Sequence, residues 1–107
     1  MKKITTFLKT SLSIKEELLE KIEDENQLLK LLTRYIQELI DTDFQYFLWM
    51  LYKIDVNENK VKETIKKNPQ NSSEIIAKLI IERVKEKIIT REKYKAEDES
   101  EDDWIFM

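Results

Sequence analysis

Residues 44–54 read FQYFLWMLYKI, in which only Gln45 and Lys53 are polar. Five of the eleven side chains are aromatic, namely Phe44, Tyr46, Phe47, Trp49 and Tyr52. A helix that is apolar on nearly every side belongs at the centre of a domain or in an interface. The stretch therefore predicts a central apolar helix at 44–54, with Trp49 as a core residue whose change to Ala costs about 3–5 kcal/mol.

Further helices are predicted on the C-terminal side of this stretch. Asp41-Thr42-Asp43 supplies N-cap candidates for residues 44–54, and Asp55-Val56-Asn57-Glu58 supplies a cap for a short helix that ends at Lys67. Asn68-Pro69-Gln70-Asn71 predicts a loop, because proline disfavours helix at the residue before it. Asn71 or Ser72 is expected to cap a last helix, in which apolar residues recur at helical spacing until Ile89.

On the N-terminal side, residues 1–12 are expected to be a short lead-in that packs a helical turn on the body. Ser13-Ile14-Lys15-Glu16 has the pattern of a capping box and predicts a helix that runs to Ile22. A turn is expected at 23–26. Apolar residues then cover more than one face of residues 28–40, so this helix should contact neighbours on two sides.

The composition agrees with an all-α fold. The 107 residues include no Gly, no Cys, no His and one Pro. Without glycine, Asn or Asp is expected at turn positions that need a positive φ, and hairpin-rich β folds are disfavoured. We expect a compact array of four or five helices in a single domain at 1–95, followed by an acidic tail with an apolar C-terminal tip at 96–107.

The missing residue types exclude most catalytic sites. Without His or Cys there is no usual general base, no cysteine nucleophile and no imidazole or thiolate metal ligand. A calcium loop beginning at Asp55 would need Gly and Glu where Lys60 and Lys66 stand, so capping explains these polar residues better. Tyr35, Tyr46 and Lys53 lie near the predicted core, where packing is the simpler interpretation. We expect no enzyme, cofactor, metal site or small-molecule substrate.

The net charge of −3 is divided into blocks of opposite sign. Residues 12–59 carry 5 basic and 11 acidic side chains, residues 60–95 carry 11 basic and 5 acidic ones, and residues 96–107 carry 6 acids and no base. Adjacent blocks of opposite charge are typical of an interaction surface and a solvating tail. The longest apolar run, 46–52, has 7 residues, whereas a membrane span needs about 20. We therefore expect no membrane association and a cytoplasmic location.

Two segments are candidate binding sites. In the tail, acids precede large apolar side chains, which suits docking to a partner protein through Asp102, Asp103, Trp104, Ile105 and Phe106. Two other interpretations stay open: the tail folds back, with its acids on the basic block at 60–95 and Trp104 and Phe106 completing the core, or it only solubilises the protein. The end of the last helix is basic with an interleaved tyrosine, which suits nucleic acid; its residues are Arg83, Lys85, Lys87, Arg91, Lys93, Tyr94 and Lys95. The leading hypothesis is a non-enzymatic interaction module that binds a partner protein or itself as a homodimer. The alternative is a weak nucleic-acid binder gated by the acidic tail.

Two resemblances accompany these interpretations. The stretches LYKIDVNENKV (51–61) and EIIAKLIIERVKEKI (74–88) resemble segments of short all-helical bacterial proteins without an assigned function, which implies a small helical fold and no site residues. The last seven residues, EDDWIFM, resemble the acidic tips of bacterial single-stranded-DNA-binding proteins, which recruit partner proteins. The sequence departs from those tips because Met107 follows Phe106, and the remainder shows no OB-fold pattern.

Overall fold

The protein is helical throughout the part that the computed structural model describes, which is residues 2–98 with side chains up to residue 93. Six helices and no strand lie in this range, so the predicted all-α class is confirmed. The segment expected to be a lead-in is a complete helix. The helices are α1 (Lys2–Leu12), α2 (Glu16–Leu19), α3 (Glu25–Thr42), α4 (Phe44–Lys53), α5 (Glu58–Lys67) and α6 (Ser72–Asp98).

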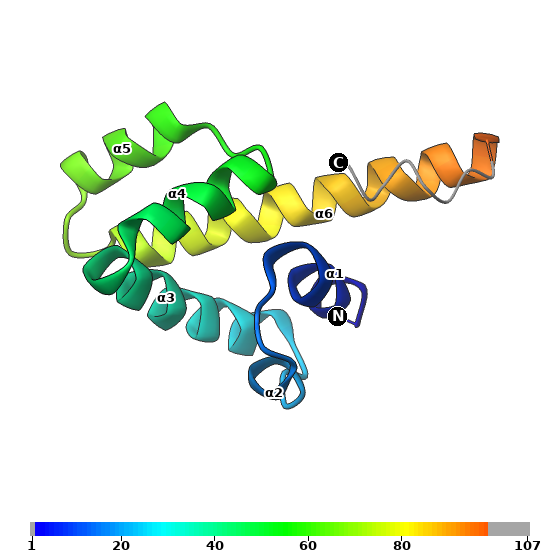
Figure 1. Ribbon diagram of the computed structural model, residues 1–107, viewed down its shortest axis with the longest axis horizontal. Coiled ribbons are helices and arrows are strands. Elements are labelled where there is room, and N and C mark those ends of the chain that lie inside the picture. Colours follow the sequence, from blue (N-terminus) through cyan, green and yellow to red (C-terminus); the bar gives the residue numbers. More distant parts are fainter. Residues whose placement is uncertain (1, 99–107) are drawn as a thin grey trace.

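The long helix α6 is the element to which most of the others attach. It packs against α1, α3 and α5, while α4 packs against α1, α3 and α5. In Figure 1, α6 crosses the whole molecule and continues past the other helices at its C-terminal end. The described chain measures 43 × 31 × 21 Å along its principal axes. The 27-residue helix α6 accounts for most of the longest dimension, since an α-helix rises about 1.5 Å per residue.

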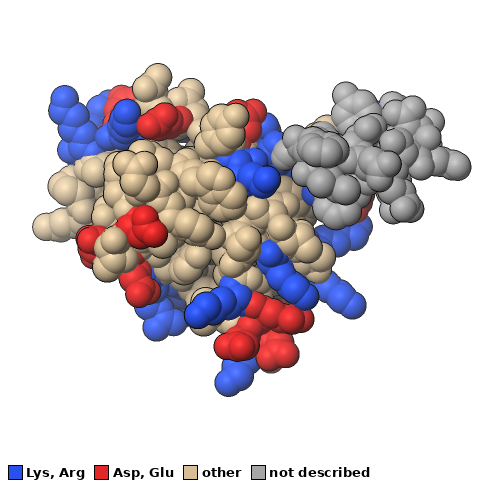
Figure 2. All heavy atoms as spheres, viewed as in Figure 1, with Lys and Arg blue, Asp and Glu red and all other residues tan. Residues whose placement is uncertain are grey.

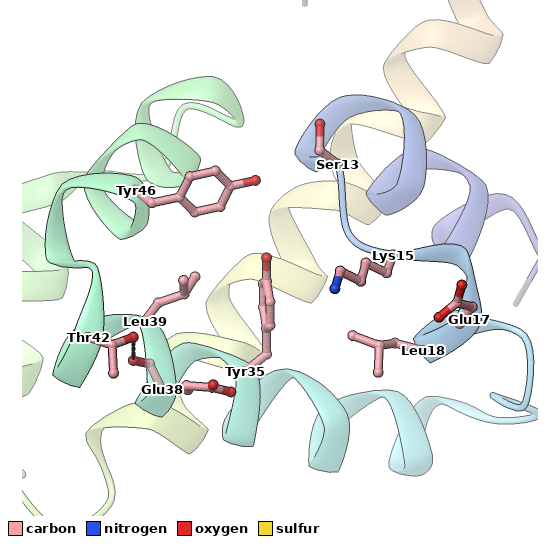
Figure 3. Close-up of a pocket in the computed structure, with 9 residues that line it drawn as sticks. All are labelled: Ser13, Lys15, Glu17, Leu18, Tyr35, Glu38, Leu39, Thr42 and Tyr46. Carbon is pink, nitrogen blue, oxygen red and sulfur yellow. Dashed lines mark hydrogen bonds between the residues drawn. The ribbon is translucent and has the colours of Figure 1, made fainter.

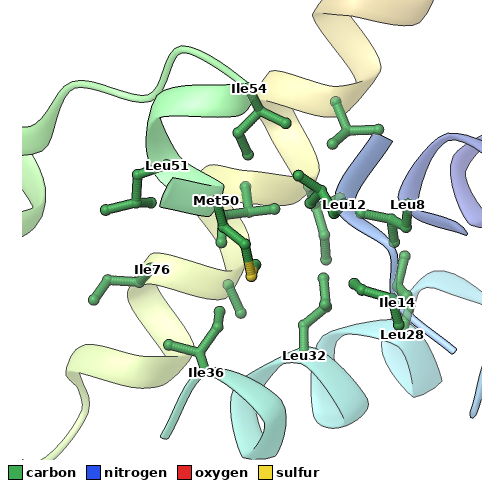
Figure 4. Close-up of a cluster of buried hydrophobic side chains, with 14 of the residues drawn as sticks. Leu8, Leu12, Ile14, Leu28, Leu32, Ile36, Met50, Leu51, Ile54 and Ile76 are labelled. Atoms are coloured by element: carbon green, nitrogen blue, oxygen red, sulfur yellow. The ribbon is translucent and has the colours of Figure 1, made fainter. Parts of the chain in front are cut away.

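The core is built from side chains of α1, α3, α4 and α6 that meet in one cluster (Figure 4). It is mainly aliphatic, and Phe47 is its largest fully buried member. Because each of these helices contributes one buried stripe, the core depends on all four. The fully buried residues, which include Val61 of α5, are Leu8, Leu12, Leu28, Leu32, Ile36, Phe47, Met50, Leu51, Ile54, Val61, Ile76, Ala77, Ile80 and Val84.

Helix α4 is buried on one face only. Phe47, Met50 and Leu51 face the core, whereas Phe44 is 41%, Trp49 40% and Tyr52 84% exposed. The prediction that Trp49 is a core residue is therefore wrong. The physical reason is that α1, α3 and α5 cover one side of this short helix, and no described segment covers the other.

Short polar side chains start three of the helices. Asp24 accepts a hydrogen bond from the Gln27 backbone N–H at 2.8 Å, and Asp43 accepts one from the Tyr46 N–H at 3.2 Å. Asn57 accepts from the N–H groups of Asn59 and Lys60, the second and third residues of α5. These bonds satisfy amide groups that have no partner inside a helix. The caps expected at 41–43 and 55–58 are thus confirmed. The break expected at 23–26 is found at Glu23 and Asp24 only, because α3 already begins at Glu25.

The capping box predicted at Ser13 is wrong. Ser13 has φ 56°, a left-handed conformation, and the residue before α2 is Lys15, which makes no side-chain capping bond. Only one turn of helix follows, where a helix to Ile22 was expected. Ile14 is 2% exposed and its N–H bonds the Leu8 carbonyl at 3.3 Å. The chain reverses here to bury Ile14, and this tertiary demand overrides the local capping pattern.

Asp55 ends α4 in the position that glycine usually fills. It has φ 60°; its N–H bonds the Tyr52 carbonyl at 3.1 Å, and the Val56 N–H bonds the Leu51 carbonyl at 3.0 Å. This is the Schellman pattern of a helix C-terminus. An aspartate at a positive φ is what the sequence predicts for a chain without glycine. Arg83 of α6 holds this turn, because its Nε donates to the Ile54 carbonyl at 3.2 Å.

The two faces of α4 are expected to differ in their contribution to stability. Phe47→Ala should cost about 3–5 kcal/mol, because it opens a cavity in the core. Trp49→Ala should cost about 1–2 kcal/mol, because water fills the space that the side chain leaves. Denaturant unfolding of the two variants beside the unmodified protein measures the difference. Equal losses at the two positions would contradict the one-sided burial of α4.

Candidate docking surface on helix α4

The exposed side of α4 carries three aromatic residues, Phe44, Trp49 and Tyr52, which we call the aromatic surface. At roughly 200 Å² for a full ring side chain, their exposed fractions leave about 330 Å² of aromatic area open to solvent. Exposed apolar patches on monomers reach about 300–600 Å² and the largest are often functional. The other large apolar residues exposed within the described range are Leu18 and Ile89, which lie on other helices.

Neighbouring side chains hold the aromatic surface in place. The ring centroids of Tyr46 and Trp49 are 5.2 Å apart, and Lys53 Nζ lies 5.9 Å from the centroid of the Trp49 ring. Phe44 contacts the buried Phe47 with centroids 5.7 Å apart. Trp49 therefore stands between a tyrosine ring and an ammonium group. A side chain that is already ordered loses little conformational entropy when a partner binds it.

Charged side chains lie around this face of the molecule rather than at its centre. Figure 2 shows an area without Lys, Arg, Asp or Glu where α4 crosses the face, and charged groups at the edges. The two ends of α4 differ in sign, because Asp43 caps the first turn and Lys53 stands in the last. An uncharged aromatic centre with a polar rim is the usual anatomy of a protein interface.

A groove of about 540 Å³ adjoins the aromatic surface. In Figure 3, Tyr35 of α3 and Tyr46 of α4 face this groove from one side, and Lys15 and Leu18 face it from the other. Tyr46 is shared, because it lines the groove and also stacks on Trp49. The groove is lined by Ser13, Lys15, Glu17, Leu18, Tyr35, Glu38, Leu39, Thr42 and Tyr46.

The two tyrosines of the groove are structural groups at neutral pH. The Tyr46 hydroxyl donates a hydrogen bond to the Leu12 carbonyl at 3.0 Å, which joins α4 to the end of α1. Burial, the largest effect, and the neighbouring Tyr46 together raise the pKa of Tyr35 to about 12. A phenol with a raised pKa stays protonated and donates hydrogen bonds. It is a poor general base, because a base must be deprotonated at the working pH.

Most of the basic residues predicted as a nucleic-acid site have partners within the protein. Arg83 Nη2 lies 3.2 Å from Asp55 Oδ2, and Lys85 Nζ lies 2.6 Å from Glu25 Oε1. The guanidinium of Arg91 stands over the Phe7 ring, 5.1 Å from its centroid. These contacts fasten α6 to α3, α1 and the end of α4.

The other predicted residues differ in what the structure describes. Burial, the largest effect, and Arg83 lower the pKa of Lys87, while Lys93 is exposed. The side chains of Tyr94 and Lys95 lie outside the described part of the chain. So do the predicted partner-binding residues Asp102, Asp103, Trp104, Ile105 and Phe106. The docking and nucleic-acid hypotheses for these segments stay predictions.

Residues 2–98 contain no group of three or more acidic side chains placed to hold a metal ion. Over the same range, no helix combines the length and the apolar character needed to cross a bilayer. The sequence matches no protein-family model, and comparisons with curated proteins and with solved structures find no match. The chemistry of the site must therefore be argued from its own residues.

Sequence reasoning named the members of the aromatic surface but assigned them to the core. The signal that could have identified them is the same apolar pattern, because a helix that is apolar on all sides belongs either to a centre or to an interface. The apolar pattern of residues 44–54 is compatible with a place in the core or in an interface. The burial of each side chain in the structure distinguishes the two. Phe47 belongs to the core, while Trp49 and Tyr52 are available to a partner.

The raised pKa of Tyr35 predicts a loss of stability in alkali. Below about pH 10 the Tyr35 phenol is neutral in both the folded and the unfolded chain. Above about pH 10 the unfolded chain loses the phenol proton first, because the pKa is raised only in the folded protein. The free energy of unfolding therefore falls between about pH 10 and about pH 12. Tyr35→Phe should remove part of that fall. Denaturant unfolding of both proteins on either side of about pH 10 measures it. An identical decline in the two proteins would mean that Tyr35 is not held in its neutral form.

Proposed function

We propose that this protein is a non-enzymatic interaction module that binds a partner protein through the aromatic surface of α4. The observation that carries the proposal is the exposure of three aromatic residues, Phe44, Trp49 and Tyr52, on one ten-residue helix. Tryptophan and tyrosine dominate the binding energy of many protein interfaces, because they contribute a large apolar area and few rotatable bonds. The absence of His and Cys from the sequence supports a binding role over catalysis. A chain without Cys also suits the cytoplasm.

The size of the surface favours a short partner segment over a folded domain. A stable interface between two folded proteins buries about 800 Å² on each side, well above the roughly 330 Å² of exposed aromatic area on α4. The adjoining groove extends the contact past Tyr46 towards Leu39 and Leu18. A segment with a few large apolar side chains can cover the rings and place one side chain in the groove.

The charges near α4 favour acidic residues in that segment. Helix α5, which packs against α4, carries four Lys and two Glu in its ten residues. Lys62 and Lys67 pair with Glu58 and Glu63, and these pairs occupy both glutamates. Helix α5 thus carries two more positive than negative side chains, and Lys53 stands in the last turn of the neighbouring α4. Opposite charge on the partner would steer association and set its direction.

The proposal predicts which substitutions abolish binding. Peptides selected from a displayed random library on the full chain should contain large apolar residues next to acids. They should bind Tyr52→Ser about tenfold or more weakly, because an anchor ring is lost. Tyr52 is 84% exposed, so this change should leave the fold intact.

Ile89→Ser is the matched control, since Ile89 is also large, apolar and exposed but lies on α6. Affinities measured by calorimetry for the unmodified protein and the two variants decide the outcome. Binding that survives Tyr52→Ser, or falls equally with Ile89→Ser, would refute the proposed docking surface. So would a library from which no peptide is enriched.

A further inference from the structure

The partner segment that fits the aromatic surface best is present in this chain. We infer that residues 99–107 of a second copy occupy the surface, so that two molecules exchange these segments and form a dimer. The inference rests on the proposed function and identifies the partner for the same site. It is carried by the chemistry of the segment, the charge beside α4 and the geometry of α6.

The segment has the composition that the surface requires. Residues 99–103 include four acids, Glu99, Glu101, Asp102 and Asp103, and Trp104-Ile105-Phe106-Met107 follow without a polar residue. The acids match the lysines at the α5 side of the surface. The apolar residues that come directly after them match the rings of α4 and the groove. Charged and apolar groups thus occur in adjacent blocks on both partners, acidic on the segment and basic beside the surface.

The geometry of α6 favours a second molecule over the same one. Arg83 contacts Ile54 at the end of α4, and α6 continues for 15 residues to Asp98, a distance of about 22 Å along its axis. Figure 1 shows α4 running back from that contact, away from the end of α6, so Trp49 is farther still. Trp104 is six residues beyond Asp98 and can span at most about 22 Å, so its own Trp49 is out of its reach. Phe106, eight residues beyond Asp98, can span at most about 29 Å and comes near only the Tyr52 end of its own surface. A second copy can place the whole segment along the surface.

Exchange of segments between two copies also buries a larger area than a single junction does. One junction covers a surface too small for a stable interface between folded domains. A symmetric dimer contains two identical junctions, and the second forms within an assembled pair at a high effective concentration. The extension of α6 beyond the other helices places the start of each segment where another molecule can approach it.

Complementation between two defective variants of the full chain tests this inference. The donor-defective variant carries Trp104→Ser and Phe106→Ser, and the acceptor-defective variant carries Trp49→Ala and Tyr52→Ser. Each alone should dimerise at least about tenfold more weakly than the unmodified chain in sedimentation velocity, because both junctions are lost. An equimolar mixture should associate more strongly than either variant alone and more weakly than the unmodified chain, since one intact segment and one intact surface form a single junction.

Controls separate the outcomes. Circular dichroism verifies that each variant keeps its helix content, and Tyr52→Ser alone serves as acceptor variant if the double change unfolds the protein. Ile89→Ser should dimerise like the unmodified chain. An unmodified chain that is monomeric at every concentration, a donor-defective variant that dimerises normally, or a mixture that associates no more strongly than either variant alone would each overturn the inference. The second result would indicate direct pairing of two aromatic surfaces.

Failure here and failure of the proposed function can be told apart. If library peptides bind in a Tyr52-dependent manner while the unmodified chain stays monomeric, the docking surface stands and its occupant is another protein. If neither experiment depends on Tyr52, the aromatic surface has no binding role and both proposals fail.

Discussion

The packing of α6 against α3 is the interaction on which the rest of the structure depends. Leu28, Leu32 and Ile36 of α3, and Ile76 and Ile80 of α6, are fully buried. These are the two longest helices, and their aliphatic stripes form the base on which α1 and α4 lie. Removal of this apolar area from water is the main favourable term in folding. Polar contacts then fix the alignment, because Lys85 of α6 reaches Glu25 at the start of α3.

The functional hypothesis follows from what this base leaves uncovered. One side of helix α4 packs in the core, and three aromatic residues on the other side are exposed to solvent. The two sides of this ten-residue helix differ in burial, since Phe47 is buried and Trp49 is exposed. They do not differ in composition, because both sides carry apolar residues. Large apolar groups remain exposed at a cost in solubility, and an interface is the usual reason for retaining them. The ordered contacts of Trp49 with Tyr46 and Lys53 fit this role.

The basic character of α6 has a second explanation in the structure. As a sequence, residues 83–95 suggest an electrostatic surface for nucleic acid. In the folded protein, Arg83 holds the turn after α4, Lys85 pairs with Glu25, and Arg91 covers Phe7. A charge block in a sequence does not show whether its partners lie in the same chain. The acids that receive these cations are far away in sequence, at Asp55 and Glu25.

The sequence by itself determined the helical class, the caps at Asp43 and Asn57, and the use of Asp or Asn at positive φ, which Asp55 shows and Ser13 does not. Each of these follows from interactions within a few residues, or from the lack of glycine, and such local effects do not need the rest of the fold. Tertiary structure decided the reversal at Ser13, the single turn of α2 and the exposure of Trp49. These depend on which neighbours cover which side of a helix. Residues 44–54 carry apolar side chains on nearly all sides, so the sequence pattern does not tell which side of the helix stays exposed. That depends on where α1, α3 and α5 pack against α4.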